Sequence, residues 1–262
     1  MQKAFIAGLA LGLLLPFLGV FVTLRKLSFF GDGIAHASLA GIAIGIIAGV
    51  NPFPAALAAG LLTGAFVFLL ERKTTIASDA LIGVLFPGAL ALGLVLMSIR
   101  KGYQPELFSF LFGNILSIRQ SDFVLILLLS AIMIGVLIVL FRQFALLALD
   151  HETAWLYRVP TAALDFVFYM LIASAIVLGV KLLGVILVSA LLIIPPTMGK
   201  LLARSFKQII IFSILSAEVF IIVGLVLSYI FDLPSGAPIV LVGVCSFLLL
   251  AFIQLLFAVR RT

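Results

Sequence analysis

The sequence predicts an all-α membrane protein in which eight or nine transmembrane helices form a single domain spanning residues 1–262. Hydrophobic residues make up 65% of the chain and charged residues 10%, whereas a soluble domain is usually about half apolar and about a quarter charged. One buried core cannot absorb this excess, so lipid is the expected solvent. Apolar runs of about 20 residues, the length that crosses the hydrocarbon, follow one another along the chain.

The apolar runs divide the chain into nine candidate spans. They cover residues 4–24, 33–50, 54–70, 80–98, 122–141, 162–181, 184–203, 208–231 and 238–259. The first run is longer than the apolar part of a signal peptide, and no small-residue cleavage pattern follows it, so we interpret it as a span. Eight spans is the alternative, because the second run is short and only Leu182 and Leu183 separate the sixth run from the seventh.

The basic residues predict the orientation of the chain. If the loop that holds Arg25 and Lys26 is cytoplasmic, 11 of the 16 lysines and arginines lie on the cytoplasmic side. Cytoplasmic loops of membrane proteins carry such an excess, so we expect an outside N-terminus and an inside C-terminus. The basic residues stand singly or in pairs at the ends of apolar runs, so the net charge of +6 marks membrane flanks, and no nucleic-acid partner is expected.

Three segments lie between the spans. Residues 99–121 are expected outside, and their apolar stretch 107–116 is too short to span, which suggests a re-entrant or interfacial helix. Residues 142–161 form the longest inside loop, where mixed apolar and charged residues predict a short helix near the membrane surface. Residues 232–238 are rich in proline and glycine, which is typical of a turn.

Two ionisable residues stand out in the stretch FFGDGIAHASLAG (29–41). Asp32 and His36 are four positions apart, so on a helix they share one face. Carboxylate oxygen and imidazole nitrogen both bind zinc and related divalent ions, and a two-fold dimer would supply a second pair of ligands. Alternatively, Asp32 caps the helix and His36 hydrogen-bonds a neighbour. Ionisable groups at membrane depth are costly and usually face a pathway, which favours the metal interpretation.

Glu218 is a second polar candidate in an apolar run. It lies in the middle of run 208–231, where it would either line a pathway or hydrogen-bond a neighbouring helix. The chain lacks a GxxxxGK[ST] phosphate loop and an HExxH motif, so ATP hydrolysis by that loop and zinc-protease activity are not expected. Its one cysteine, Cys245, excludes a disulfide within the chain and a cysteine metal cluster.

The motif LRKLSFFGDGIAHASLAG (24–41) resembles the signature of the permease subunits of ABC transporters that import zinc, manganese or iron. Further stretches resemble segments of this family in the same order along the chain. These stretches are LFGNIL (111–116), LDHETA (149–154), GVILVSALLIIPP (184–196) and DLPSGAP (232–238). The resemblance therefore covers nearly the whole chain.

The resemblance implies roles for individual residues and partners. Asp32 and His36 match the positions that contact metal in the translocation path. A second matching set is the segment that couples the permease to a cytoplasmic ATPase, namely Asp150, Glu152 and Ala154. The family implies a homodimer in the prokaryotic plasma membrane, two ATPase subunits that hydrolyse the ATP, and an extracytoplasmic metal-binding protein. The metal is then the transported substrate, and no permanently bound cofactor is expected.

Details of the resemblance suggest which metal is transported, and some residues depart from the family pattern. Ala35 and Ser38 resemble the zinc branch, GDxxAHAS, with manganese or iron as the alternative. Pro196 and Lys200 replace small residues of the family, and Arg158 stands where the family carries a glycine. These departures concern one helix end and the fit to the ATPase.

Two other classes of function are compatible with a polytopic chain. A gradient-driven metal carrier would show inverted repeats with paired broken helices, and the two halves of this sequence show no such correspondence. A structural membrane subunit would not need Asp32 or His36, so alanine at these positions would leave metal uptake unchanged.

Overall fold

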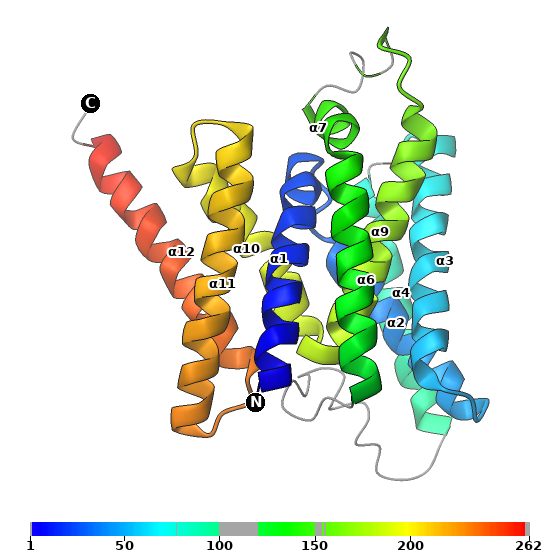
Figure 1. The fold of residues 1–262 in the computed structure, drawn as a ribbon. Helices are drawn as coiled ribbons and strands as arrows, with labels where there is room; N and C mark the ends of the chain where they lie inside the picture. Colours follow the sequence, from blue (N-terminus) through cyan, green and yellow to red (C-terminus); the bar gives the residue numbers. More distant parts are fainter. Residues whose placement is uncertain (1, 77, 100–119, 150–153, 155, 260–262) are drawn as a thin grey trace.

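The structure, a computed structural model, describes residues 2–76, 78–99, 120–149, 154 and 156–259. Its helices run side by side as a bundle, with the two chain ends at opposite ends of the bundle (Figure 1). They are α1 (Gln2–Leu24), α2 (Phe30–Ile47), α3 (Pro52–Lys73), α4 (Ser78–Ile99), α6 (Gln120–Val139), α7 (Phe141–Leu149), α9 (Thr161–Leu183), α10 (Val185–Leu202), α11 (Phe206–Phe231) and α12 (Gly236–Val259).

Within the described part of the chain, nine helices are long and apolar enough to cross a membrane. This confirms the nine-span prediction over the alternative of eight. The remaining helix, α7, lies at the end of the bundle that also carries the C-terminus (Figure 1), and it confirms the short helix expected in segment 142–161. The apolar stretch 107–116 falls outside the described residues.

Two of the differences between the predicted and observed helix boundaries bear on the site. Helix α2 begins at Phe30 and ends at Ile47, about one turn before the expected run, because the helix accommodates Asp32 in its first turn. Helix α9 continues through Leu183, and Gly184 alone joins it to α10. Gly184 has φ 79° and ψ 163°, a conformation that is nearly restricted to glycine, so this residue makes the tight hairpin possible.

Three helical turns each end in a residue with a left-handed backbone conformation. At the end of α1, the amide of Leu27 donates to the carbonyl of Val22 at 2.9 Å, the pattern of a Schellman motif. Glycine is usual at the left-handed position of this motif. In this chain non-glycine residues occupy the left-handed position, namely Lys26 (φ 58°), Arg158 (φ 55°) and Asp232 (φ 52°).

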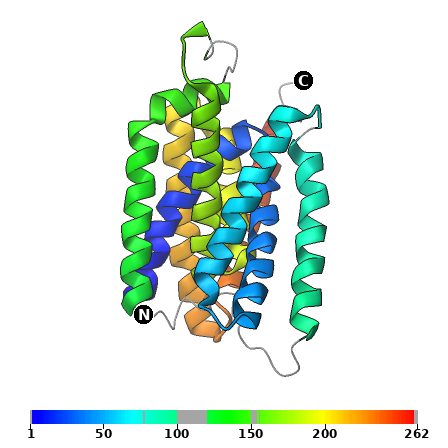
Figure 2. The same cartoon turned by 90° about the vertical axis from the view of Figure 1, so that its right-hand side faces the viewer.

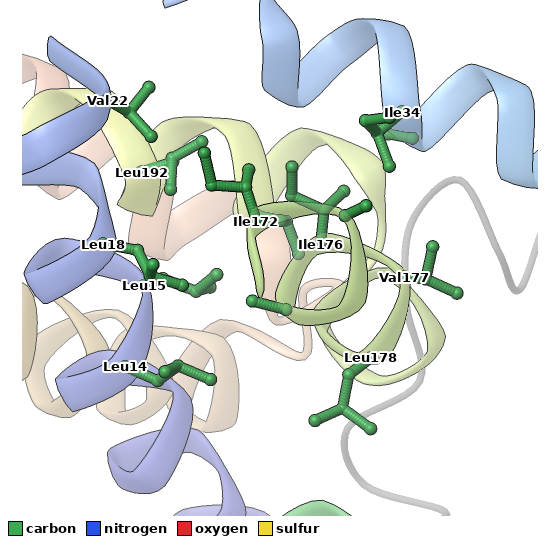
Figure 3. Packing of buried hydrophobic residues seen from close by; sticks show 14 of the residues in the cluster. Leu14, Leu15, Leu18, Val22, Ile34, Ile172, Ile176, Val177, Leu178 and Leu192 are labelled. Carbon is green, nitrogen blue, oxygen red and sulfur yellow. The ribbon is translucent and has the colours of Figure 1, made fainter. Parts of the chain in front are cut away.

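The centre of the bundle is formed by α1, α9 and α10. Leu15 and Leu18 of α1 lie in one apolar cluster with Ile172 and Ile176 of α9 and with Leu192 of α10 (Figure 3). Helices α4 and α6 stand at opposite edges of the bundle in Figure 2, and α12 is mostly exposed. Helix α2 also contacts α10, whereas the outer helices present apolar side chains to lipid.

Candidate functional site

Asp32 lies in the first turn of α2 and contacts α10. The residue at the N-cap of α2 is Phe29, and no side chain caps this helix, so the structure does not support the capping alternative for Asp32. Instead, the hydroxyl of Ser189 on α10 donates a hydrogen bond to Oδ1 of Asp32. The positive end of the α2 dipole also favours a carboxylate at this position.

His36 follows one turn later on the same face of α2. Its ring meets Phe86 of α4 edge to face, with centroids 4.6 Å apart and an interplanar angle of 78°. Its Nδ1 atom is buried and has no hydrogen-bond partner. Buried polar atoms are nearly always paired, so an unpaired one requires an explanation such as an absent ion or water. The alternative in which a neighbour satisfies His36 is therefore not supported either.

The glycines on both sides of Asp32 allow neighbouring helices to come close. A Cβ atom added to Gly31 would lie 3.0 Å from Cδ2 of Leu192 on α10, and one added to Gly33 would lie 3.1 Å from Cγ2 of Ile82 on α4. Such distances are shorter than the ~3.5–4.0 Å that carbon atoms prefer. A larger residue at either position would have to displace the side chain of Leu192 or Ile82.

The predicted ligands are too few for a closed metal site within one copy of the chain. Asp32 and His36 share a helix face, and the Ser189 hydroxyl adds one oxygen beside them. In the described part of the chain, no group of three or more His, Cys, Asp and Glu side chains is placed to hold a metal ion. The structure thus places the two predicted ligands on one face of α2, and one described copy of the chain does not by itself form a metal site.

Glu218 lies apart from this pair. It belongs to α11 and packs against α1, where its Oε1 atom would be 3.2 Å from a Cβ added to Gly12. Its other oxygen, Oε2, is buried without a hydrogen-bond partner. The structure therefore does not join Glu218 to Asp32 and His36 in one set of ligands.

The predicted coupling segment is described only in part. Asp150 and Glu152 lie outside the described residues. Ala154 is buried, and its carbonyl accepts a hydrogen bond from the amide of Val159 at 3.1 Å. The residue before Val159 is Arg158, in the left-handed conformation. This conformation gives a physical reason for a glycine there in the family, and it shows that arginine can replace that glycine at a cost in backbone strain.

Pro196, the other departure from the family pattern, lies inside α10 without ending it. Proline has no N–H, so the carbonyl of Leu192, four residues earlier, loses its partner within the helix. Gly19 of α1 approaches this carbonyl so closely that no side chain fits there. The proline and the glycine together explain the close packing of α1 on α10.

Ser189 and Phe86 were not predicted as part of the site. Ser189 carries a hydroxyl within the apolar first half of α10, which was an available signal, but its partner lies 157 residues away in the chain. Phe86 is one of 24 phenylalanines, and nothing in its local sequence distinguishes it.

Comparison with known proteins identifies the family. The ABC 3 transport family model matches residues 1–254. The chain belongs to this family. It is 33% identical to the "Manganese transport system membrane protein MntC" of Listeria monocytogenes, and the match covers 100% of this chain and 91% of that protein. It is 30% identical to the "High-affinity zinc uptake system membrane protein ZnuB" of Haemophilus influenzae, with 95% of each chain covered.

A solved structure shows the same fold. "PsaBC from Streptococcus pneumoniae in complex with Fab" superposes with a TM-score of 0.83 at 30% identity, covering 95% of this chain and 90% of that one. The prediction of a permease subunit from the family of ABC transporters for metals is thus confirmed. The permease is a multi-pass protein of the prokaryotic plasma membrane, and a separate ATPase subunit hydrolyses the ATP.

Proposed function

We propose that this permease imports a divalent transition metal ion, with zinc preferred over manganese and iron. An extracytoplasmic binding protein delivers the ion, and a homodimer of the permease with two ATPase subunits moves it to the cytoplasm. The observation that supports this proposal is the pairing on one face of α2 of a carboxylate, Asp32, with an imidazole, His36, whose buried Nδ1 has no partner. Relatives named for manganese and for zinc are consistent with this class of substrate.

The preference for zinc rests on Ala35 and Ser38, which resemble the zinc branch of the family, and the donor atoms are compatible with it. Zinc accepts imidazole nitrogen and carboxylate oxygen in a four-coordinate arrangement, whereas manganese favours more oxygen ligands. Two copies related by a two-fold axis would offer two aspartates and two histidines, the number that a tetrahedral site requires. Because an imported ion must also leave, we expect this site to bind weakly and transiently.

We also propose that ATP hydrolysis is coupled to transport at the end of the bundle that carries α7. We assign docking of the ATPase to Asp150, Glu152 and Ala154, which follow α7 directly. Closure of the ATPase pair would then rock the two permease copies and change the side to which Asp32 and His36 are open. Glu152→Arg should uncouple metal uptake from ATP hydrolysis while leaving membrane insertion intact, and normal uptake by this variant would count against the assignment.

Uptake by the complete complex in proteoliposomes tests the metal site. Asp32→Asn and His36→Gln should each lower zinc uptake by at least about tenfold, since loss of a mere supporting group near a metal already costs about that much. Asp122→Asn is a matched control, because Asp122 is also an ionisable residue at the start of a span but pairs with Lys181 at 2.8 Å. Uptake that falls equally in all three variants would contradict a specific role for the pair.

Competition between metals tests the preference for zinc. A tenfold excess of manganese should leave most zinc uptake intact in the wild-type complex. If manganese competes on equal terms, the proposal is reduced to import of divalent transition metals in general. ATP dependence is checked in the same vesicles, because uptake that follows an imposed ion gradient without ATP would favour the carrier alternative.

Glu218 remains a candidate for the translocation path, because its buried Oε2 atom has no hydrogen-bond partner. Glu218→Gln keeps the size of the side chain and removes its charge. Lower uptake with unchanged protein level would support a place in the path. Unchanged uptake would assign the residue to packing between α1 and α11.

A further inference from the structure

A cluster of polar and aromatic side chains lies where α1 ends and α9 begins. Arg25, the residue after α1, forms an ion pair with Asp165 of α9. Its guanidinium also lies over the ring of Phe168, with Cζ 4.8 Å from the ring centroid. Only 15% of the Arg25 side chain and 14% of the Asp165 side chain is exposed, so this pair is largely removed from solvent.

The same face of α9 holds the beginning of α2 and the end of α3. Tyr169 donates a hydrogen bond through its hydroxyl to Oε2 of Glu71, in the last turn of α3. Its buried ring meets the ring of Phe30 edge to face, with centroids 5.0 Å apart. Phe30 is the first residue of α2 and stands two residues before Asp32. One stretch of α9 therefore fixes the position of the helix that carries the proposed metal ligands.

Helix α7 packs on this stretch from the other side. The ring centroid of Phe144 lies 5.6 Å from that of Phe168 on α9 and 6.1 Å from that of Phe21 on α1. All three phenylalanines are buried. Helix α7 leads directly into the segment that we assign to ATPase docking. Packed side chains thus link α7 to Phe168 and Arg25, and Tyr169, the residue after Phe168 on α9, contacts the start of α2.

Packing alone would not require the ion pair and the hydrogen bond to a carboxylate that this cluster contains. Burying an ion pair is costly, and apolar residues of similar volume stabilise a fold equally well or better. A pair and a charged hydrogen bond do, however, fix one geometry, because their strength depends on direction and distance. This property suits a junction that must hold α2 in one of two defined positions.

We propose that Arg25, Asp165, Tyr169 and Glu71 act together as positioning residues for metal transport. They transmit displacement of α7 to the start of α2 and so to Asp32. The proposal rests on the proposed function, in which Asp32 and His36 contact the metal. None of the four residues is assigned contact with the ion.

Charge exchange in the complete complex tests this role. Arg25→Asp and Asp165→Arg should each lower the metal transported per ATP hydrolysed by about fivefold or more, the range of typical coupling between sites. The double exchange should restore at least half of the wild-type ratio. Tyr169→Phe, which removes only the hydroxyl, is the milder variant in case a reversed charge prevents assembly, and it should lower the ratio by a smaller factor.

The ion pair at the opposite end of α9 is the matched control. Lys181 pairs with Asp122 at 2.8 Å and lies 4.1 Å from the ring centroid of Phe53, so it also joins several helices. Exchange of the charges of Lys181 and Asp122, singly or together, should leave metal transported per ATP unchanged. If single exchanges at Lys181 uncouple transport as strongly as those at Arg25, or if the Arg25–Asp165 double exchange fails to restore coupling, the proposal is overturned.

A readout without metal separates this proposal from the proposed function. Ile44 is exposed near the end of α2, so Ile44→Cys, combined with Cys245→Ser, reports movement of α2 through thiol labelling with and without ATP. The ATP-dependent change should be present in this background, lost on adding Arg25→Asp and regained in the double exchange. Normal uptake by Asp32→Asn and His36→Gln would refute the metal site alone, whereas labelling that Arg25→Asp leaves unchanged would refute the positioning role alone.

Discussion

Gly19 is the position where a single added methyl group should do most damage to the contact between α1 and α10. A Cβ atom at this residue would lie 2.8 Å from Cγ of Pro196, and closer still to the carbonyl oxygen of Leu192. The carbonyl belongs to the backbone, so it cannot rotate away as a flexible side chain would. Gly19→Ala should therefore force the two helices apart.

The size of the effect follows from these distances. Carbon atoms pack best at about 3.5 Å or more, so α1 and α10 must separate by roughly 0.7 Å to clear Pro196 alone. Overpacking of a core costs about 1–3 kcal/mol, and contact with rigid backbone places this case near the upper end. Alanine is better than glycine in a helix by about 1 kcal/mol. The expected net loss is about 2 kcal/mol, which corresponds to a Tm lower by roughly 4–8 °C.

Thermal unfolding of the purified permease in detergent measures this loss. Gly135→Ala is the matched control, because a Cβ at Gly135 of α6 meets no atom within 4 Å, and this variant should be slightly stabilised. Metal uptake should fall in Gly19→Ala as well, since displacement of α10 moves Ser189 away from Asp32. Equal Tm values for the two variants would refute the argument that α1 and α10 are held in contact through Gly19.

Three further changes test the site and the backbone. Ser189→Ala removes the donor to Asp32 and should raise KM for zinc uptake about tenfold with little change in maximal rate. Ser189→Thr keeps the hydroxyl, so its KM should stay near the wild-type value. Uptake kinetics of the two variants check this. Gly184→Ala should lower the free energy of unfolding by about 1–3 kcal/mol because its backbone conformation excludes side chains, and an unchanged Tm would contradict the assigned hairpin. Arg158→Gly should raise Tm by roughly 2–4 °C, because it relieves about 1 kcal/mol of left-handed strain; a lower Tm would show that the side chain of Arg158 contributes more than its backbone strain costs.

The transmembrane helices could be predicted because lipid imposes a simple rule of length and polarity. In the part of the chain that the structure describes, each of the nine apolar runs corresponds to a helix, but the sixth and seventh are joined at Gly184 and not at Leu182 and Leu183. The start of α2 was misplaced because the length rule treats a charged residue as a boundary. Asp32 lies within the helix because Ser189 supplies a partner for its carboxylate, and a rule of length and polarity alone does not include such a partner.

The candidate site was predictable only in part. Spacing along one helix was enough to pair Asp32 with His36, because helical geometry is local. Partners from distant helices have no such local signal. Ser189 lies 157 residues from Asp32, and Asp165 lies 140 residues from Arg25. The pairing of Asp165 with Arg25 follows from the packing of α9 beside the end of α1.

The position of α1 has a consequence for how the chain is made. This helix packs against α10 and α11, which are synthesised much later than α1. At about 5–20 residues per second, the interval between the end of α1 and the end of α11 is on the order of 10–40 s. For most of that time the close-packing surface at Gly12 and Gly19 lacks α10 and α11, which supply its final partners. Assembly in the bilayer must therefore keep the N-terminal helix available until the last third of the protein emerges.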